Sequence, residues 1–280
     1  LTVVLREIRG IEAKRSEIYT DASGINHFTW ITEAKYGNTD LLALLPEFME
    51  RFYEEGYYEQ PGRRFAFRED PFAYGNKVKL DLFHRYGALA AAGDRHLAEF
   101  VPGSWYLRSP EAVRDWQFGL TSVDFRIRQQ AERIQETLDL AEGRKKFRIG
   151  RSGEEAADLI KALLGFGTVV SNVNMPNLGQ MPGLPMGAIV ETNCVFTNGY
   201  VKPVTAKALP AGVLALVRRA SDNVDAVCEG IRERDLDKIF AAFMNQALCS
   251  TLSWEEGEAL FKEMCENTRE YLAPYYPQFR

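Results

Sequence analysis

Hydrophobic and polar residues follow two different periods along this chain. Apolar residues recur every three to four positions over residues 2–14, which predicts a helix. Residues 16–25 and 28–35 alternate with a period of two, which predicts two strands. Further helices are predicted at residues 40–55, 77–89, 94–100, 110–142, 152–164, 210–231, 233–248 and 253–272. Further strands are predicted at residues 168–172 and 188–196, with a loop at 174–187 and a hairpin turn at Asn198-Gly199.

The order of these elements indicates the fold class. Strands and helices are interleaved through the middle of the chain, and the last third is helical, so we expect an α+β fold. Residues 56–76 are irregular and aromatic, which is typical of a lid, a dimer contact or a packed surface loop. The second half of the predicted helix at 110–142 is rich in charge, which indicates a solvated face.

Composition narrows the class of protein. The 280 residues are 46% hydrophobic and 26% charged, as in globular proteins with one large domain or two smaller ones. The net charge of −5 gives no basic surplus for binding nucleic acid or an anionic membrane. No apolar run reaches the roughly 18 residues of a membrane span, and no leader-like segment opens the sequence. Four cysteines without C-x-x-C spacing favour a reducing, cytoplasmic setting without disulfides.

Histidine is rare, and one histidine stands at a predicted turn. His27 is one of only three histidines, and it lies between Asn26 and an apolar run that favours a strand. A neutral imidazole at such a boundary is suited to bind a metal ion. The residues alone favour the simpler interpretation, in which backbone hydrogen bonds satisfy the ring where the strand begins. Downstream, Asp94 follows the small residues 90–93 and is suited to cap the next helix.

A set of motifs in a fixed order adds a stronger signal. Gly24-Ile25-Asn26-His27 resembles the G-[IVL]-N-H signature of glycoside hydrolase family 4, the NAD- and Mn-dependent glycosidases. Further blocks that resemble this family follow in the same order, at residues 81–87, 92–100, 172–180, 184–185 and 188–191. The resemblance runs through nearly the whole chain and is closest to the branch with α-glucosidases and α-galacturonidases. It implies the C-terminal domain that this family shares with lactate and malate dehydrogenases, a small and mostly antiparallel sheet surrounded by helices.

The resemblance also implies a reaction and a set of site residues. The family's reaction oxidises C3 of the sugar with NAD, eliminates the leaving group after loss of the C2 proton, adds water and reduces the ketone again. It implies His27 as a ligand of Mn²⁺, which accepts imidazole, and Asp94 as the group that moves a proton at C2 or at the leaving group. The substrate-binding residues that we expect are Asn26, Arg95, His96, Asn174 and Asn177. Turn-forming asparagines and a partly exposed histidine are the simpler interpretations of this second set.

Two parts of the family's machinery are absent from the sequence. Dinucleotide binding on a Rossmann domain needs a strand, G-x-G-x-x-G and then a helix, whereas Gly165-Phe166-Gly167 follows a predicted helix and lacks the third glycine. The family's metal also takes a cysteine upstream of the histidine, and no cysteine precedes Cys194. We therefore expect residues 1–280 to be the catalytic and substrate domain without its N-terminal NAD-binding domain, inactive alone.

The expected partners are a sugar substrate, the absent nucleotide-binding domain and further copies of the chain. A natural two-chain arrangement is the alternative to a truncated chain. A 2-hydroxy-acid dehydrogenase domain and a non-catalytic oligomerisation domain are the competing functional hypotheses.

Overall fold

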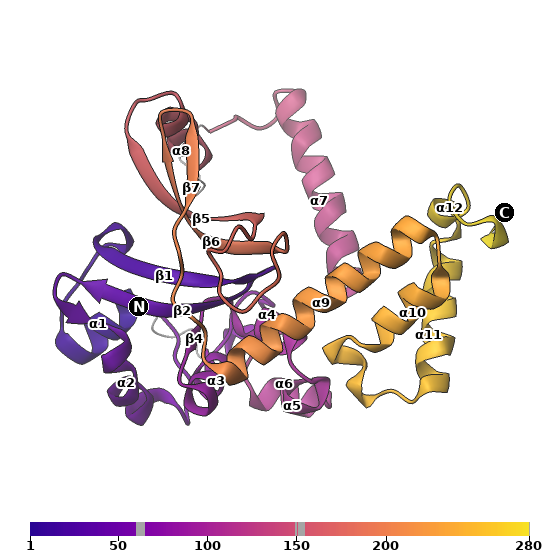
Figure 1. Cartoon of the computed structure of the whole chain (residues 1–280), viewed down its shortest axis with the longest axis horizontal. Helices are drawn as coiled ribbons and strands as arrows, with labels where there is room; N and C mark the ends of the chain where they lie inside the picture. The colour runs from indigo at the N-terminus through magenta and orange to yellow at the C-terminus, as the bar shows by residue number, and fades with distance from the viewer. Residues whose placement is uncertain (60–64, 149, 151–154, 280) are drawn as a thin grey trace.

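A computed structural model describes residues 1–59, 65–148, 150 and 155–279 of the chain (Figure 1). Its strands are β1 (Ile18–Ile25), β2 (Phe28–Tyr36), β3 (Thr39–Asp40), β4 (Leu89–Ala90), β5 (Thr168–Pro176), β6 (Ile189–Thr197) and β7 (Tyr200–Pro203). Its helices are α1 (Thr2–Arg9), α2 (Leu45–Phe52), α3 (Lys77–Tyr86), α4 (Asp94–Phe100), α5 (Gly103–Tyr106), α6 (Pro110–Asp115), α7 (Val123–Ala141), α8 (Ala156–Leu163), α9 (Ala211–Glu233), α10 (Leu236–Met244), α11 (Trp254–Asn267) and α12 (Arg269–Leu272).

One sheet organises these elements. Its strand order is β3-β2-β1-β6-β5, with β4 beside β2 and β7 beside β6. The paired strands of the described sheet run antiparallel. The predicted α+β class with a mainly antiparallel sheet and surrounding helices is therefore confirmed. Within the described residues, none of the helices is long and apolar enough to cross a bilayer.

Of the three hydrophobic clusters among the described residues, one packs α8 on β5 and β6, and the other two hold β1 and β2 in place. The larger cluster joins the β1–β2 hairpin and β6 to α3, α4 and α9, and it includes Phe28, Trp30, Val78, Leu97, Val190, Val213 and Val217. The smaller cluster packs α1 and α2 around β2, and it includes Val4, Leu5, Ala34, Leu45 and Phe48. The larger cluster packs beside the turn end of the β1–β2 hairpin, through Ile25 and Phe28, and the smaller cluster packs at its other end, through Ala34.

The predicted continuous helix at residues 110–142 is wrong. The chain instead forms α6 and then α7, with a bend at Gln117, whose φ is +56°. A Cβ on Gly119 would lie 2.9 Å from the carbonyl oxygen of Phe67, so the chain passes too close to its neighbour here to continue as a helix. Ser122 then caps α7 by accepting the amide of Phe125.

Other helix and strand boundaries in the structure also differ from the predicted ones. The sequence placed Asn174 in a loop, whereas β5 continues to Pro176 because it pairs with β6 along its full length. The predicted helix at 40–55 is shorter, because residues 39 and 40 pair with β2 as strand β3. The predicted helix 2–14 ends at Arg9, where Gly10 adopts the left-handed conformation. The predicted cap at Ser152 lies outside the described residues.

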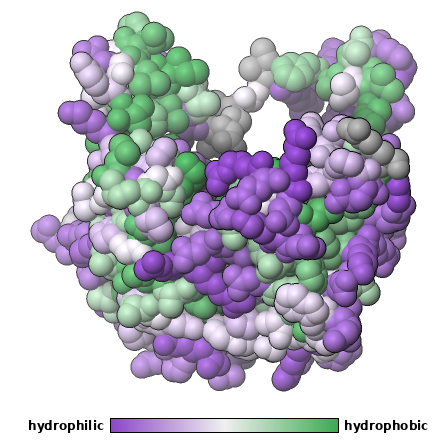
Figure 2. Space-filling model, turned by 45° about the vertical axis from the view of Figure 1, so that its right-hand side comes forward, coloured by the Kyte–Doolittle hydropathy of each residue, from purple (hydrophilic) through white to green (hydrophobic). Residues whose placement is uncertain are grey.

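Two segments extend away from the packed layers. Strands β5 and β6 with α8 form an arm, and α7 stands on the other side of the same end of the molecule (Figure 1). None of the 19 residues of α7 is buried. Hydrophobic residues are visible on both upper lobes of the space-filling view (Figure 2). These two segments therefore present apolar surface that the described chain does not cover.

Candidate functional site

The β1–β2 hairpin presents His27 at its tip. Asn26 and His27 form the two-residue turn, and both have positive φ, +43° and +67°. A type I′ turn needs this backbone because it follows the twist of the two strands. Histidine rarely adopts positive φ, so the turn holds some strain, a feature often found at functional sites. Both residues are exposed, which leaves the imidazole accessible to a ligand.

Glu191 supports this turn from another strand. The backbone amide of His27 donates to Oε1 of Glu191 at 3.0 Å. Glu191 lies on β6 opposite Gly24, and this is the register pair between β1 and β6. Sequence reasoning placed residues 188–191 in a family block but gave Glu191 no role. Its signal was an acidic side chain within a predicted strand, which alone does not identify its partner.

The ring of His96 stacks against the ring of His27. Their ring centroids lie 5.4 Å apart with an interplanar angle of 24°. His96 comes from the first turns of α4, and its Nδ1 lies 3.5 Å from Oε2 of Glu99 one turn later. Glu99 therefore provides a carboxylate that orients the second imidazole. The structure thus brings together two of the sequence-predicted residues, one from the hairpin and one from α4.

Asp94 lies beneath this surface. It is 0% exposed, and its carboxyl oxygens accept the backbone amides of Val78 and Lys79 at 3.3 and 3.1 Å. We had expected Asp94 to cap its own helix, α4. It instead caps the N-terminus of α3. Burial raises its pKa to about 6, although the nearby Lys79 charge and the backbone amides of α3 oppose this rise. Direct proton transfer by Asp94 stays a prediction, and its carboxyl group has no exposed surface here.

Arg95 points to a different neighbourhood. Its Nη1 donates to the carbonyl oxygen of Pro71 at 3.2 Å, and its guanidinium lies 5.0 Å from the centroid of the Phe72 ring. The same ring contacts Phe125 and Arg126 at the start of α7. Arg95 is partly buried and thus links α4 to α7 through Phe72. A role in binding a substrate carboxylate stays a prediction.

The two predicted asparagines differ from each other. Asn174 is exposed on β5, and it lies opposite Glu191 in the register of β5 and β6. It is therefore next to the residue that supports the His27 turn. Asn177 is buried, and its Nδ2 donates to the carbonyl oxygens of Met181, Leu184 and Pro185. Its Oδ1 accepts the amides of Gly179 and Met181. The side-chain amide of Asn177 therefore makes its hydrogen bonds within its own loop, and we do not include it among the proposed substrate contacts.

The donor set around His27 fits one side of a metal site. An imidazole together with oxygen ligands is acceptable to Mn²⁺. Among the residues that the structure describes, however, no group of three or more histidine, cysteine, aspartate or glutamate side chains is placed to hold a metal ion. The role of His27 as a metal ligand therefore stays a prediction.

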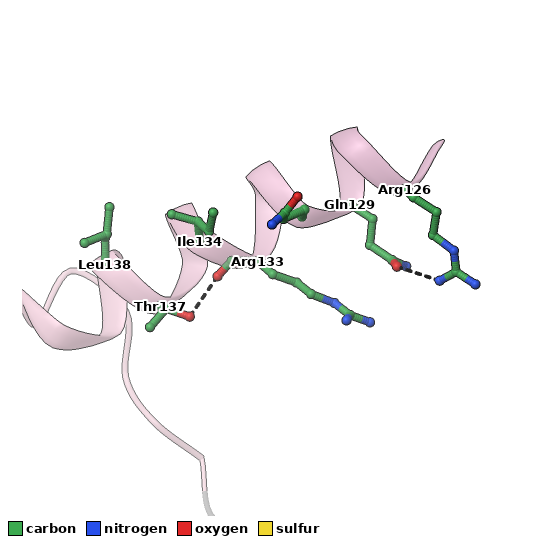
Figure 3. Close-up of a pocket in the computed structure, with 7 residues that line it drawn as sticks. Arg126, Gln129, Arg133, Ile134, Thr137 and Leu138 are labelled. Carbon is green, nitrogen blue, oxygen red and sulfur yellow. Dashed lines mark hydrogen bonds between the residues drawn. The ribbon is translucent and has the colours of Figure 1, made fainter. Parts of the chain in front are cut away.

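Two surface hollows lie elsewhere. One is lined by residues of α7 alone (Figure 3), and the other by residues in α2 and α3 and just after them, including Tyr53 and His84. Neither is lined by His27, His96 or Glu191.

Comparison with known proteins decides the family. Residues 22–249 match the Family 4 glycosyl hydrolase C-terminal domain. The chain belongs to glycosyl hydrolase family 4. The matched residues include the His27 turn, α4 and Glu191, so the site described above lies inside the family's C-terminal domain.

Relatives in this family carry a specific name. The chain is 46% identical over 97% of its length to an alpha-galacturonidase of Thermoanaerobacterium saccharolyticum, and 43% identical over 95% to an alpha-galacturonidase of Bacillus subtilis. It spans 58% of the length of each of these relatives.

Solved structures have the same fold. A crystal structure of lplD from Bacillus subtilis, described as a candidate glucosidase, matches with a TM-score of 0.86 at 43% identity, covering 94% of this chain and 59% of that one. A Thermotoga maritima 6-phospho-beta glucosidase with manganese, NAD⁺ and glucose-6-phosphate matches with a TM-score of 0.66, covering 96% of this chain and 58% of that one. At 16% identity, the second match supports the fold alone.

Proposed function

We propose that this chain is the substrate-binding and catalytic domain of an α-galacturonidase. The observation that carries this proposal is the 43–46% identity to proteins of that name over nearly the whole chain. The geometry supports it, because an exposed histidine from the family signature lies beside a second histidine and a carboxylate. An α-glucoside is the alternative substrate, since both belong to the branch that the motifs resemble.

The cofactors proposed are Mn²⁺ and NAD. Similar structures of the family are complexes with NAD and Mn²⁺. Bound Mn²⁺ would supply Lewis-acid stabilisation of negative charge that develops on sugar oxygens, and NAD would supply reversible oxidation. His27 would hold the metal. An NAD-binding domain that is not within residues 1–280 would complete the site, and for this reason we expect no turnover by these residues alone.

The remaining site residues are assigned to the sugar. Asn26 and Asn174 are exposed amides on either side of the Glu191 position, and an amide both donates to and accepts from hydroxyl groups. His96 lies against His27 and would therefore contact the same sugar unit as the group bound at His27. Arg95 would recognise the uronate carboxylate, which requires it to leave the carbonyl of Pro71.

We also propose that the whole protein is located in the cytoplasm.

The test uses a protein in which this chain is joined to a family 4 NAD-binding domain. With NAD⁺ and Mn²⁺ added, we expect hydrolysis of an aryl α-galacturonide in preference to the matching α-glucoside. His27→Ala is expected to abolish turnover and to weaken Mn²⁺ binding, whereas His84→Ala, a histidine on α3 in contact with Tyr53, is the matched control. Oxidation of a 2-hydroxy acid without glycoside hydrolysis would instead favour the dehydrogenase hypothesis.

A further inference from the structure

Lys79 contacts the segment that leads into Asp94 at both of its ends. It lies in the first turn of α3, and its backbone amide donates to Oδ1 of Asp94 at 3.1 Å. Its Nζ donates to the carbonyl oxygen of Ala91 at 3.4 Å, three residues before Asp94. Lys79 is partly buried, so its side chain does not extend freely into solvent. The ammonium group is therefore held close to the turn that presents Asp94.

The buried Asp94 carboxyl group needs a positive charge nearby if it is ionised. Within the part of the chain that the structure describes, its oxygens accept backbone amides of α3. The Tyr74 ring packs on Gly93, where a Cβ would lie 3.0 Å from its Cζ, and burial and then the charge of Asp94 raise the pKa of Tyr74. A carboxylate in such a place is unfavourable unless a cation balances it. Lys79 supplies that cation.

The charges of Lys79 and Asp94 act on each other. Burial raises the pKa of Asp94 to about 6, and the positive charge of Lys79 is the strongest effect that opposes this rise. Burial lowers the pKa of Lys79, and the charges of Asp94 and then Glu59 oppose that change. Lys79 also lies near the amino group of Leu1, whose pKa is lowered by burial and then by the charge of Lys79. Each member of the Lys79–Asp94 pair thus stabilises the charged form of the other.

We propose that Lys79 is the positioning residue of Asp94. Its ammonium group, tied to the turn through Ala91, keeps the buried carboxyl group ionised, which is the form that accepts a proton. Its backbone amide holds the same carboxyl group against the N-terminus of α3. The consequence for catalysis rests on the proposed function, in which Asp94 moves a proton of the sugar, whereas the effect of Lys79 on the charge of Asp94 does not.

The first experiment titrates the Asp94 carboxyl group by carbon NMR of the 280-residue chain with labelled aspartates, and Asp94→Asn assigns the signal. Lys79→Gln keeps a donor for the carbonyl oxygen of Ala91 but removes the charge, so the titration midpoint of Asp94 is expected to rise by about one pH unit. Lys79→Arg keeps the charge, so the midpoint is expected to stay near that of the wild type. Lys79→Met removes donor and charge together and should shift the midpoint at least as far as Lys79→Gln.

Lys77→Met is the matched control. Lys77 lies on the same turn of α3, but its Nζ donates to the carbonyl oxygen of Glu54, so removal of its charge should leave the Asp94 midpoint unchanged. An unchanged midpoint in both uncharged variants of Lys79, or an equal rise in Lys77→Met, overturns the proposal. A rise in Lys79→Met without one in Lys79→Gln also overturns it, because the hydrogen bond to Ala91 and not the charge would then be required.

The second experiment measures kcat and KM against pH in the protein joined to a family 4 NAD-binding domain. With the ionised carboxyl group as proton acceptor, Lys79→Gln should move the acid limb of the kcat profile upward by about one pH unit, so that kcat at a given acidic pH falls about tenfold while KM is unchanged. Lys79→Arg should restore the wild-type profile. An acid limb that stays in place overturns the catalytic part of the proposal. Absence of turnover in the joined wild type would count against the glycosidase proposal, and the NMR titration would still decide the role of Lys79.

Discussion

The backbone amide of His27 donates to Oε1 of Glu191 across 3.0 Å, and this bond joins two residues 164 positions apart in the sequence. His27 has positive φ, which is unfavourable for histidine by about 1 kcal/mol or more. A hydrogen bond to a charged carboxylate contributes about 1.5–3 kcal/mol, enough to offset that strain. Glu191 is therefore the residue that holds the His27 backbone in the orientation seen at the tip of the hairpin.

Replacement of Glu191 should show whether its hydrogen bond to the His27 backbone or its negative charge is required. In Glu191→Ala the amide of His27 loses its acceptor, so hydrogen exchange at that amide should accelerate and Mn²⁺ affinity should fall about 10-fold or more. Glu191→Gln keeps an oxygen acceptor, so both measurements should stay near the wild type. An equal loss in the two variants would show that the negative charge, and not the hydrogen bond, is required.

The parts of this site that could be predicted are those encoded locally. The period-two pattern on both sides of Asn26-His27 predicted the hairpin, because each strand's alternation is visible in its own residues. The capping of α3 by Asp94 and the support of His27 by Glu191 could not be predicted, since each partner lies on another element. The bend at Gln117 was missed for the same reason: it depends on the close approach of Gly119 to Phe67, which no local pattern reports.

The buried carboxyl group of Asp94 predicts a pH dependence of stability. Burial raises its pKa from 3.8 in the unfolded chain to about 6, so between these values the folded state keeps a proton that the unfolded state has released. Its contribution to stability is therefore largest below about pH 4 and is lost as pH rises through about 6. The loss amounts to about 3 kcal/mol in the free energy of unfolding.

Urea unfolding of the wild type and Asp94→Asn at several pH values tests this dependence. Asparagine does not titrate and keeps one oxygen for the amides of α3. The stability of the wild type relative to the variant should therefore fall by up to about 3 kcal/mol between about pH 4 and about pH 7. A constant difference across that range would mean that the carboxyl group stays ionised in the folded state. In the protein joined to a family 4 NAD-binding domain, loss of glycosidase turnover by Asp94→Asn without any change in stability would favour the proton-transfer role instead.

A row of buried polar atoms crosses the sheet behind the site. Ser23 pairs with Trp30 on β2 and, by the register of Gly24 with Glu191, faces Thr192 on β6. The Ser23 hydroxyl, the Trp30 indole nitrogen and the Thr192 hydroxyl are all buried without a hydrogen-bond partner. A buried hydroxyl without a partner destabilises the fold by about 1–3 kcal/mol.

Thr192→Val removes one of these hydroxyls and keeps the shape of the side chain. We expect the free energy of unfolding to rise by about 1 kcal/mol, measured by urea denaturation. Thr32→Val is the matched control, because the Thr32 hydroxyl donates to Asp21 and its removal should lower stability by about 1 kcal/mol. Destabilisation by Thr192→Val would indicate that an ordered water bridges the row.

Gly24, the first residue of the signature, is fixed by the packing of the hairpin. A Cβ at this position would lie 2.2 Å from the carbonyl oxygen of Phe28 and 2.5 Å from the Cα of Thr29, and both are backbone atoms that cannot rotate away. Gly24→Ala should therefore separate β1 from β2, lower the free energy of unfolding by about 3 kcal/mol or more, and displace His27 from His96. Gly150→Ala is the control, since a Cβ at Gly150 meets no atom of the described residues within 4 Å. If Gly24→Ala unfolds at the same urea concentration as the wild type, the hairpin has room to adjust, and the glycine of this motif must then be explained by something other than packing, such as the approach of a sugar to the backbone.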